Sequence, residues 1–545
     1  MDSAYDRALS EIGMVGIFQK NFDLIYNVAL SAMWSAAYMH MILALTVIPH
    51  NCKLPEKTQN ITDDAWKLKY IPHEHVYDKI NFENCLIYLN PDESNETRSC
   101  NDYEYDTTWY GSTVSSEKNW VCDKKMYIPN ILAYSKITEL TGSMFFGWIG
   151  DTFGRRPTYI ITLLVTIIGR IISIVSGQSH IIFLCGCLIN SFGTWSVMQC
   201  ATVVSVEITS SKRRSLITSM RFASGCVGVS IMALVYWWLR DWKIFIIVTT
   251  APLLLFLLFS WSMIESPRWL YSNGKTKDCV KLLKRIAKRN HKHLQAKTEE
   301  EILSYIPQSE TKSLGPLAMF SSRKMAMNTV LQLFLWAIGT TCFALQILSI
   351  GQISNENPFM EYFWQTMSQI PANFVSAWLA DRFGRRYTSA VSFFLMSAAW
   401  FLLAFRETSS YSWAKAGWIA TILNVVLRFV NAITYYVANL FAMELYPTSL
   451  RQTALSLGNV CGSLGSVIAP YILFLGRPID ERLPGLVLCV LALFATGCSV
   501  LLPETLNMKL PETIEEAQSF GQKKQKYSSV SLQSNDKPEE KIRIN

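Results

Sequence analysis

Charged residues are scarce in this chain of 545 residues: 17% are Asp, Glu, Lys or Arg, whereas 50% are hydrophobic. The mean hydropathy of +0.19 is high for a water-soluble protein of this length. Catalytic motifs are lacking too. The sequence has no Gly-x-Ser-x-Gly turn, no glycine-rich phosphate loop ending in Lys-Ser or Lys-Thr, and no paired His/Cys spacing. These absences argue against a membrane enzyme and predict neither a cofactor nor a bound metal.

The apolar residues lack the period-two alternation of a membrane barrel, so helices are the remaining way to span lipid. A helix needs about 20 apolar residues to cross a bilayer. No basic region followed by a short apolar stretch and a cleavage site opens the chain, so we expect the first span to be its own anchor. The sequence predicts an all-α membrane protein with spans at 22–48, 127–149, 158–176, 181–206, 215–239, 244–263, 327–350, 360–380, 388–405, 415–442, 452–475 and 484–502.

The segment 49–126 between the first two spans is too polar to cross a membrane. It carries the glycosylation sequons Asn-Ile-Thr at Asn60 and Asn-Glu-Thr at Asn95. Its cysteines are even in number, which suggests two disulfides in an oxidising compartment, with three pairings open. They are Cys52, Cys85, Cys100 and Cys122. Sequons and cysteines together predict that this loop lies outside the cell.

Basic residues cluster at the other ends of the spans, at 155–156, 212–214, 382–386 and Arg451. This is the positive-inside bias, and with twelve spans it predicts that both termini are cytosolic. The net charge of +8 then reflects topology, and we expect no nucleic-acid partner. The expected organisation is a cytosolic N-terminus 1–21, an N-terminal half 22–263, a central cytosolic loop 264–326, a C-terminal half 327–502 and a cytosolic tail 503–545. The oligomeric state stays open.

A basic stretch in the central loop, KTKDCVKLLKRIAKRN, has the spacing of a helix with one apolar face. The simplest interpretation is a cytosolic surface helix that bridges the two halves. The alternative is a helix that binds lipid headgroups or a calmodulin-like partner.

Two charged stretches recur about 230 positions apart: GWIGDTFGRRP from Gly147 and AWLADRFGRRY from Ala377. Each half has another such stretch after its fourth span, so the halves read as parallel six-helix repeats. Partly desolvated charges at helix ends could lock the halves in one state and be exchanged for water in another. The alternative is that they only mark topology. The gating candidates are Asp151, Arg155, Arg156, Glu207, Glu265, Arg268, Asp381, Arg385, Arg386, Glu444 and Arg451.

The chain resembles the organic cation/anion transporter branch of the major facilitator superfamily nearly end to end. The motifs that carry the resemblance are PHNCKLP at 49–55, STVSSEKNWVCDK at 112–124, GWIGDTFGRRP, ESPRWL at 265–270, DRFGRR at 381–386, ELYPTSLRQ at 444–452 and LPETLNMKLPETIEEA at 502–517. Sugar porters share ESPRWL and ELYPT, but the large first loop and the tail motif favour the organic-ion branch. The resemblance implies a plasma-membrane protein with twelve helices in two halves that rock around a site at mid-membrane.

Polar and aromatic side chains inside the spans are the candidates for that site, because lipid disfavours them. An aromatic cage with a few polar groups suits a small organic ion. The candidates are Trp237, Trp336, Phe343, Gln369, Arg428, Tyr435, Tyr436, Asn439 and Ser463. Other interpretations are an interface belt for Trp237, core packing for Phe343 and a structural lock for Arg428.

The resemblance also bears on substrate charge. In cation carriers of the family the position of Ser463 is typically Asp and that of Gln369 often Glu, whereas anion and carnitine-type carriers often have Arg in place of Ser463. Both positions are neutral here. The aromatic lining favours an organic cation or a zwitterion as substrate. An organic anion held by Arg428 is the alternative, and a sugar-porter-like facilitator is a third.

Overall fold

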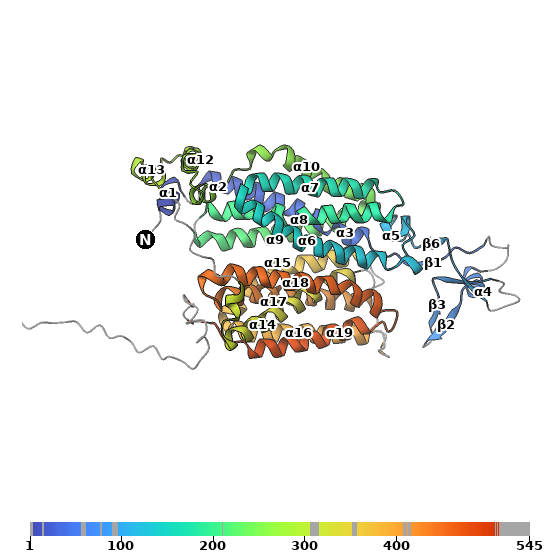
Figure 1. The fold of residues 1–545 in the computed structure, drawn as a ribbon. Coiled ribbons are helices and arrows are strands. Elements are labelled where there is room, and N and C mark those ends of the chain that lie inside the picture. The colour runs from blue at the N-terminus through green and yellow to red at the C-terminus, as the bar shows by residue number, and fades with distance from the viewer. Residues whose placement is uncertain are drawn as a thin grey trace, which may run out of the picture.

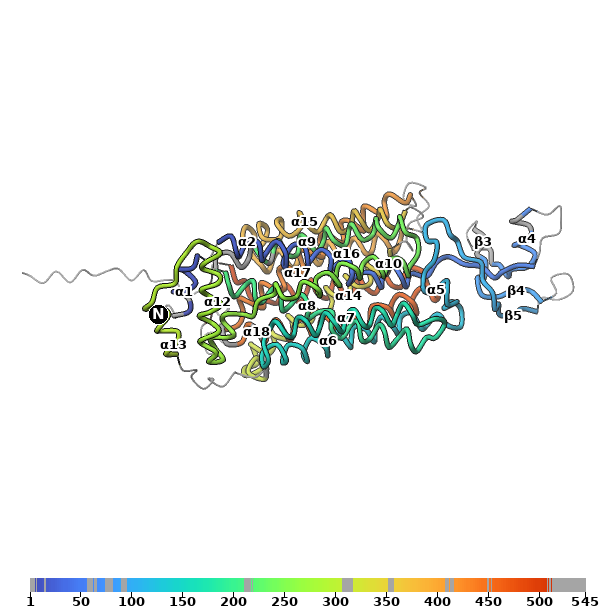
Figure 2. Tube along the Cα trace, turned by 90° about the horizontal axis from the view of Figure 1, so that it is seen from above, coloured from blue at the N-terminus to red at the C-terminus, as the bar shows by residue number. Residues whose placement is uncertain are grey.

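The computed structural model describes residues 4–13, 16–55, 62–76, 79–89, 96–209, 211–305, 316–350, 357–406, 411, 416–506, 508 and 511. Long helices run side by side along one axis, and short strands extend beyond one end of them (Figure 1). We call this end the loop end, because residues 49–126 lie there. The other end carries α1 (Ala4–Ile12), α12 (Thr276–Arg289) and α13 (Ala296–Leu303), as Figure 2 also shows. We call it the opposite end.

Twelve long helical segments occur in the described part of the chain, and each coincides with one predicted span to within several residues. The first is divided into α2 (Ile17–Phe22), the π-helical η1 (Asp23–Ala29) and α3 (Leu30–Ala44). The rest of the N-terminal half is α6 (Tyr127–Phe153), α7 (Arg155–Val175), α8 (His180–Glu207), α9 (Ser211–Leu239) and α10 (Trp242–Leu258). The C-terminal half is α14 (Arg323–Leu348), α15 (Pro358–Phe383), α16 (Arg385–Arg406), α17 (Gly417–Glu444), α18 (Thr448–Gly476) and α19 (Leu483–Leu501).

Eight of these helices are long and apolar enough to cross a membrane by length and composition: α7, α8, α9, α14, α16, α17, α18 and α19. The other four depart from that standard in recognisable ways. α10 has only 17 residues, and the first segment is interrupted by its π-helical turn. α6 contains Lys136 and Glu139, and α15 contains Gln369 and Asn373, all of which line a cavity described below. Helices that carry polar side chains into an interior are less apolar than helices that face lipid.

The buried apolar side chains form separate cores in the two halves. One core draws its described residues from 319–502 and another from 5–302, so each belongs to one side of the molecule. A third core combines both halves, for example Trp242 and Phe245 with Ile347 and Phe359. This mixed core lies at the loop end. The halves also meet where α9 packs against α15 and α6 against α18.

The helices of the central loop belong to the N-terminal half. α12 packs against α1, α2, α13 and α11 (Pro267–Ser272). Its apolar side chains Val280, Leu283 and Ile286 are buried in the N-terminal core. Asn290 at its end fixes the N-terminal segment, since Nδ2 donates to the Ile12 carbonyl at 2.9 Å and Oδ1 accepts from the Phe18 N–H at 2.9 Å.

This packing corrects the two interpretations of the basic stretch. Among the described residues, α12 packs on elements of the N-terminal half and thereby extends that half. Its apolar face is covered by protein, so this face is not available to a calmodulin-like partner. Its basic residues occupy the solvated side, as Lys284 does in pairing with Glu299 at 2.6 Å.

Segment 49–126 contains α4 (Asp63–Tyr70), α5 (Val114–Glu117) and three antiparallel two-stranded sheets. β1 (His50–Cys52) pairs with β6 (Tyr103–Tyr105), β2 (His73–Val76) with β3 (Lys79–Phe82), and β4 (Leu86–Tyr88) with β5 (Thr97–Ser99). Such small sheets have little core of their own, so cross-links matter. The two sequon residues Asn60 and Asn95 lie outside the described residues.

Two disulfides hold this segment together, which selects one of the three open pairings. Cys52 is joined to Cys100 and Cys85 to Cys122, with Cα–Cα distances of 5.7 and 5.6 Å. Closing loops of 48 and 37 residues stabilises a fold by about 4 kcal/mol each in the chain-entropy account. The second bond also ties the strands to the start of α6.

Peptide mapping without reduction tests the pairing. We expect one linked peptide joining Cys52 to Cys100 and another joining Cys85 to Cys122. Cys85→Ser should expose Cys122 to a membrane-impermeant maleimide while the first link persists. Cys185→Ser is the control, because Cys185 is an exposed free cysteine and its loss should change neither link. A peptide joining Cys52 to Cys85 or to Cys122 would contradict the structure.

Candidate functional site

A cavity of about 450 Å³ lies between the two halves and is lined by residues of both. The N-terminal half contributes α3, α6, α8 and α9, and the C-terminal half contributes α14, α15, α17 and α18. Six of the nine residues predicted as substrate contacts line it: Trp336, Phe343, Gln369, Arg428, Tyr435 and Ser463. The volume is suited to a small organic molecule.

The other three predicted contacts are not among the residues that line the cavity. Trp237 packs against the mixed core at the loop end, and Tyr436 packs against the C-terminal core. Asn439 donates from Nδ2 to the Tyr435 carbonyl at 2.8 Å on its own helix. It shares a helix face with Arg428 but lies about 16 Å further along the axis. Helical spacing therefore identified the face of α17 that lines the cavity, but it placed the end of the lining too far along the helix, at Asn439.

In the C-terminal wall of the cavity, α14 and α17 meet through two side-chain pairs, each of which contains at least one aromatic ring. The two pairs lie at different heights along the helix axes. The Arg428 guanidinium lies over the Phe343 ring, 4.1 Å from its centre. The Trp336 and Tyr435 rings meet edge to face, with centres 5.3 Å apart. Trp336 and Phe343 are seven residues apart on α14, and Arg428 and Tyr435 are seven apart on α17, so the two levels are separated by about 10 Å.

Glycines in α18 allow this wall to be tight. A Cβ added at Gly458 would lie 2.8 Å from the Trp336 indole, and one at Gly462 would lie 3.0 Å from Thr340. Thr340 also donates to the Gly462 carbonyl at 2.8 Å. The Gly-x-x-x-Gly spacing thus serves the packing of α18 on α14.

Two buried arginines in the bundle differ in their partners. Arg170 donates from Nε to Thr250 Oγ1 at 2.6 Å and from Nη1 to the Ala37 carbonyl at 2.7 Å, so it ties α7 to α10 and α3. Arg428 is equally buried, at 1% exposed, but its Nε and Nη1 have no hydrogen-bond partner among the described residues. A buried polar atom without a partner is costly. Arg170 is a structural tie, whereas Arg428 presents unused donors at the cavity.

The N-terminal wall contains groups that the site prediction missed. Lys136 Nζ binds Glu139 at 3.0 Å and the Tyr38 hydroxyl, and Tyr38 donates to Glu139 at 3.0 Å. Trp34 stacks on Tyr38 with ring centres 5.1 Å apart. A third charged residue of this wall, Arg221, donates to Thr202 Oγ1 at 3.2 Å. Trp34 and Tyr38 are four residues apart, and Lys136 and Glu139 three apart, so helical spacing was the available signal.

Three aromatic rings of the mixed core join the halves at the loop end, outside the set of residues that line the cavity. Tyr110 comes from the end of the loop segment, Tyr236 from α9 and Phe359 from α15. The Tyr110 ring lies 5.9 Å from that of Tyr236 and 4.9 Å from that of Phe359, and the last two are 5.7 Å apart. We call these three rings the aromatic seal. It joins both halves through side chains that are at least nine-tenths buried.

Hydrogen bonds attach the end of the loop to the N-terminal half. Tyr236 donates to the Ser112 carbonyl at 3.0 Å, and Trp242 Nε1 donates to Glu117 at 2.7 Å. Lys118 is buried, with Nζ 3.0 Å from Ser176 Oγ, and this burial lowers its pKa. These hydrogen bonds fix the end of the loop to α7, α9 and α10, whereas the Tyr110 ring contacts Phe359 of the other half.

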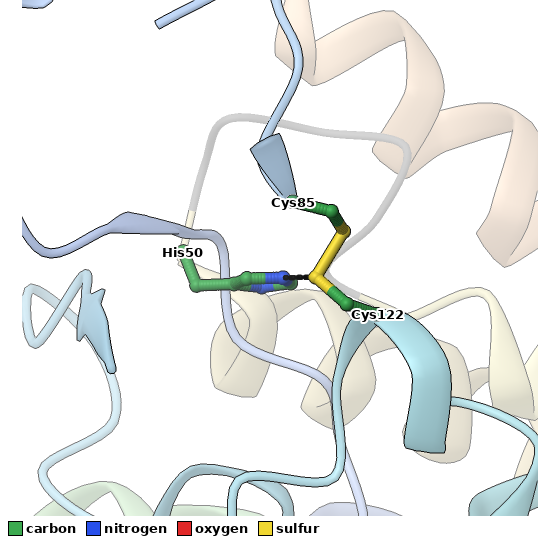
Figure 3. A group of neighbouring side chains, drawn as sticks. All are labelled: His50, Cys85 and Cys122. Atoms are coloured by element: carbon green, nitrogen blue, oxygen red, sulfur yellow. Dashed lines mark hydrogen bonds between the residues drawn. A yellow bond between two sulfur atoms is a disulfide. The ribbon is translucent and has the colours of Figure 1, made fainter. Parts of the chain in front are cut away.

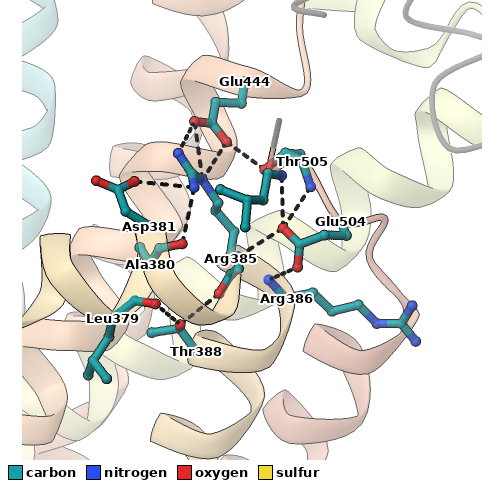
Figure 4. A network of polar contacts seen from close by, with 11 residues as sticks. Leu379, Ala380, Asp381, Arg385, Arg386, Thr388, Glu444, Glu504 and Thr505 are labelled. Carbon is teal, nitrogen blue, oxygen red and sulfur yellow. Dashed lines mark hydrogen bonds and ion pairs between the residues drawn. The ribbon is translucent and has the colours of Figure 1, made fainter. Parts of the chain in front are cut away.

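Charged clusters at the opposite end follow one plan in both halves. Figure 4 shows the C-terminal cluster, in which Glu504 accepts from the backbone N–H of Arg385 at 2.9 Å and of Arg386 at 3.1 Å. In the N-terminal cluster Glu265 accepts from the N–H of Arg155 at 2.7 Å and of Arg156 at 3.3 Å. Each carboxylate thus satisfies the free N–H groups that begin α7 or α16.

A single glycine separates α6 from α7, and another separates α15 from α16. Gly154 has φ +110° and Gly384 has φ +94°, which favours glycine. A Cβ at either position would lie within 2.5 Å of the capping carboxylate. In both copies of the motif the chain therefore turns at a single glycine, and a carboxylate from another segment caps the helix that follows. Glu504 was missed as a site residue, although the tail motif contains it.

The predicted gating residues lie in these clusters, and their ion pairs stay within one half. Arg155 binds Asp151 at 2.9 Å, while Arg385 binds Asp381 at 3.3 Å and Glu444 at 3.0 Å. The remaining candidates surround these pairs. Glu207 accepts from Ser266, Arg451 Nε donates to the Tyr446 carbonyl at 3.1 Å, and Arg156 and Arg268 are exposed.

One group in the loop segment has metal-ligand chemistry: His50, Cys85 and Cys122 (Figure 3). Both sulfurs belong to the disulfide, so neither is a thiolate ligand. His50 Nε2 lies 3.9 Å from Cys122 Sγ, and burial lowers the pKa of this histidine. The contact packs the imidazole against the cross-link.

Comparison with known proteins gives the family. The family described as "Sugar (and other) transporter" matches residues 85–517, which is most of the chain. Solute carrier family 22 member 1 of Oryctolagus cuniculus is 27% identical over 97% of this chain and 98% of its own length. The organic cation transporter protein of Drosophila melanogaster is 26% identical over 95% of both chains. The carcinine transporter of the same species is 24% identical over 96% of this chain and 80% of its own.

Solved structures of similar fold include those of the xylose transporter XylE from E. coli. Its inward-open conformation has a TM-score of 0.58 at 15% identity, over 72% of this chain and 89% of that one. Its partially occluded inward-open conformation has a TM-score of 0.57 at 15% identity, over 89% and 99%. These likenesses show a major facilitator fold. The chain therefore belongs to the sugar (and other) transporter family, and its whole-length similarity groups it with the organic-ion transporters of solute carrier family 22.

Proposed function

We propose that the protein carries small organic ions across the plasma membrane by alternating access, with the central cavity as the substrate site. The observation that carries this proposal is the cavity itself. It lies between two repeated halves, and aromatic rings and charged groups line it. The name of the Drosophila melanogaster organic cation transporter protein favours an organic cation as substrate, and the aromatic lining of the cavity suits an organic cation or a zwitterion. A sugar-porter-like facilitator is less favoured, because neutral sugars give no role to an unpartnered arginine.

The proposed orientation places the loop end outside the cell and both termini in the cytosol. Disulfides in the loop suit an oxidising compartment, and the basic clusters lie at the opposite end. In this orientation the aromatic seal closes the outer path. Among the described residues, the ion pairs of the charged clusters at the cytosolic end each stay within one half, which supports an inward-facing state.

In the proposed cycle, the aromatic seal opens on the outside when the halves close at the cytosolic end, and the reverse. Substrate binding between the halves would favour their approach at the cytosolic end and the parting of the aromatic seal outside. Asp151 and Asp381 have side chains that are 76% and 73% exposed, so they are free to meet the facing half when that end closes. Glu265 and Glu504 hold the corners beneath them.

Glycosidase treatment tests the orientation. We expect the protein from animal cells to gain mobility on a gel after digestion, because Asn60 and Asn95 would face the secretory lumen and then the outside. The double variant Asn60→Gln, Asn95→Gln should show no shift. A wild-type protein without a shift, and with loop cysteines that react only after the membrane is permeabilised, would place the loop inside.

Uptake of a radiolabelled panel tests the function. The panel contains organic cations, zwitterions, organic anions and sugars, and uptake is measured at two membrane potentials. We expect saturable uptake of at least one organic ion, with Trp336→Ala raising KM about fivefold through the loss of about 1 kcal/mol of ring contact. Trp238→Ala is the matched control, because Trp238 is 83% exposed. Uptake of sugars alone, or of no solute, would contradict the proposal.

Removing the exposed acids tests the cytosolic lock. Asp151→Ala and Asp381→Ala should reach the cell surface normally, because each loses only an exposed i,i+4 pair worth about 0–1 kcal/mol. Transport should nevertheless fall several-fold if the acids hold the halves together in the outward-facing state. Glu300→Gln removes an exposed acid from α13 and should leave uptake unchanged. Normal transport by both Asp variants would reduce these residues to markers of topology.

A further inference from the structure

The charge of the cavity wall suggests a narrower class of substrate than the organic ions as a whole. Three cationic side chains line the cavity: Lys136, Arg221 and Arg428. Among the described residues that line the cavity, Glu139 is the only one with a carboxylate, and it already binds Lys136 and Tyr38. A substrate carrying positive charge alone would enter a site whose net charge is positive.

Arg428 is the cation with the least compensation. The guanidinium stays protonated in proteins and offers its donors as a planar fork. Here two of its nitrogens lack hydrogen-bond partners, although the residue is 1% exposed. The Phe343 face offsets part of the charge but accepts no hydrogen bond in the plane of the fork. A carboxylate matches this geometry, because its two oxygens can accept two parallel N–H bonds.

Arg221 adds to the same field from the other half. It lies on α9, lines the cavity, and has Thr202 as its hydrogen-bond partner at 3.2 Å and the Phe222 ring at 4.9 Å. None of these neighbours is an acid. The cavity therefore carries one guanidinium from each half, that of Arg221 near Tyr435 and that of Arg428 over Phe343.

The aromatic pair below Arg428 gives the second pole of the site. Trp336 and Tyr435 lie about 10 Å from the Phe343–Arg428 level along α14 and α17. Their rings carry no formal charge and can accept an ammonium group or an apolar body by cation–π or stacking contact. The wall is thus bipolar, with an anion-seeking level toward the loop end and a cation-accepting level toward the opposite end.

We propose that the site selects carboxylate-bearing organic ions, zwitterions in the first place, and that Arg428 binds the carboxylate while the Trp336–Tyr435 pair receives the cationic part. This inference rests on the proposed transport function. It also explains why the residues at positions 463 and 369 are neutral. Ser463 and Gln369 line the cavity without adding an acid that would neutralise Arg428.

The test uses three probes that differ by one group. We compare a trimethylammonium carboxylate with its methyl ester and with an analogue that has an uncharged tert-butyl group in place of the ammonium. The readouts are uptake and thermal stabilisation of the purified protein. We expect wild type to prefer the zwitterion to the ester at least tenfold, and to bind the carboxylate lacking ammonium less well than the zwitterion. Arg428→Gln should bring the ratio of the KM values for ester and zwitterion toward one.

Two further variants keep the test decisive. Ser463→Asp should shift preference toward the ester, because it supplies the cavity with a second carboxylate, and this result does not depend on the folding of an Arg428 variant. Arg428→Lys should keep part of the preference for the zwitterion, since it keeps the charge and loses the fork.

The outcomes separate the inference from the transport function. A wild-type protein that takes up the ester as well as the zwitterion, or better, overturns the inference and leaves organic-ion transport standing. Tight binding of the carboxylate without ammonium, at or above the zwitterion, reassigns the site to organic anions. Failure of every solute in the panel contradicts the transport function itself.

Discussion

A charged side chain inside a membrane bundle needs a compensating group, and the location of those groups organises this molecule. Arg170 shows the complete case, since threonine hydroxyls and backbone carbonyls of two other helices surround it. Lys136 and Glu139 compensate each other with Tyr38 between them. Arg428 is left with an aromatic face and unused donors. The same residue type is therefore structural where the fold supplies every partner and available for a ligand where it does not.

The same principle applies at the helix ends. The starts of α7 and α16 expose backbone N–H groups at a membrane edge, and one carboxylate satisfies each of them. Glu265 comes from the segment after α10, and Glu504 from the segment after α19. The last helix of each half is thereby tied back to its third helix. This tie makes each half a unit that can move as a whole, which the proposed rocking motion requires.

The sequence predicted the helices well, because lipid imposes a length and an apolar composition that local reading detects. The repeat of Asp-x-Phe-Gly-Arg-Arg also predicted the two clusters and their relation. It did not reveal Glu504, because a cap contributed by a residue about 120 positions away leaves no local pattern. The site was predicted on one wall only. Arg428 and Trp336 stood out as isolated residues, whereas Trp34 and Tyr38 looked like part of an ordinary apolar span.

Spacing along one helix also fails at the ends of a cavity. Tyr435 and Asn439 are one turn apart on the same face, yet Tyr435 lines the cavity and Asn439 is not among the lining residues. The limit of a cavity depends on how neighbouring helices diverge, and that is a property of packing between helices far apart in sequence. The disulfide pairing was likewise open until the strands brought Cys52 beside Cys100.

The two ends of the bundle carry different kinds of contact, and this difference gives the cycle a direction of control. The aromatic seal at the loop end consists of apolar contacts between Tyr110, Tyr236 and Phe359, which are short-ranged and insensitive to salt. The opposite end carries exposed charges whose mutual attraction water and salt weaken. Parting the seal exposes ring surface to water, whereas closing the charged end desolvates carboxylates and guanidinium groups. A substrate that neutralises guanidinium charge between the halves lowers the cost of bringing them together, so substrate charge and state change are coupled at Arg428 and Arg221.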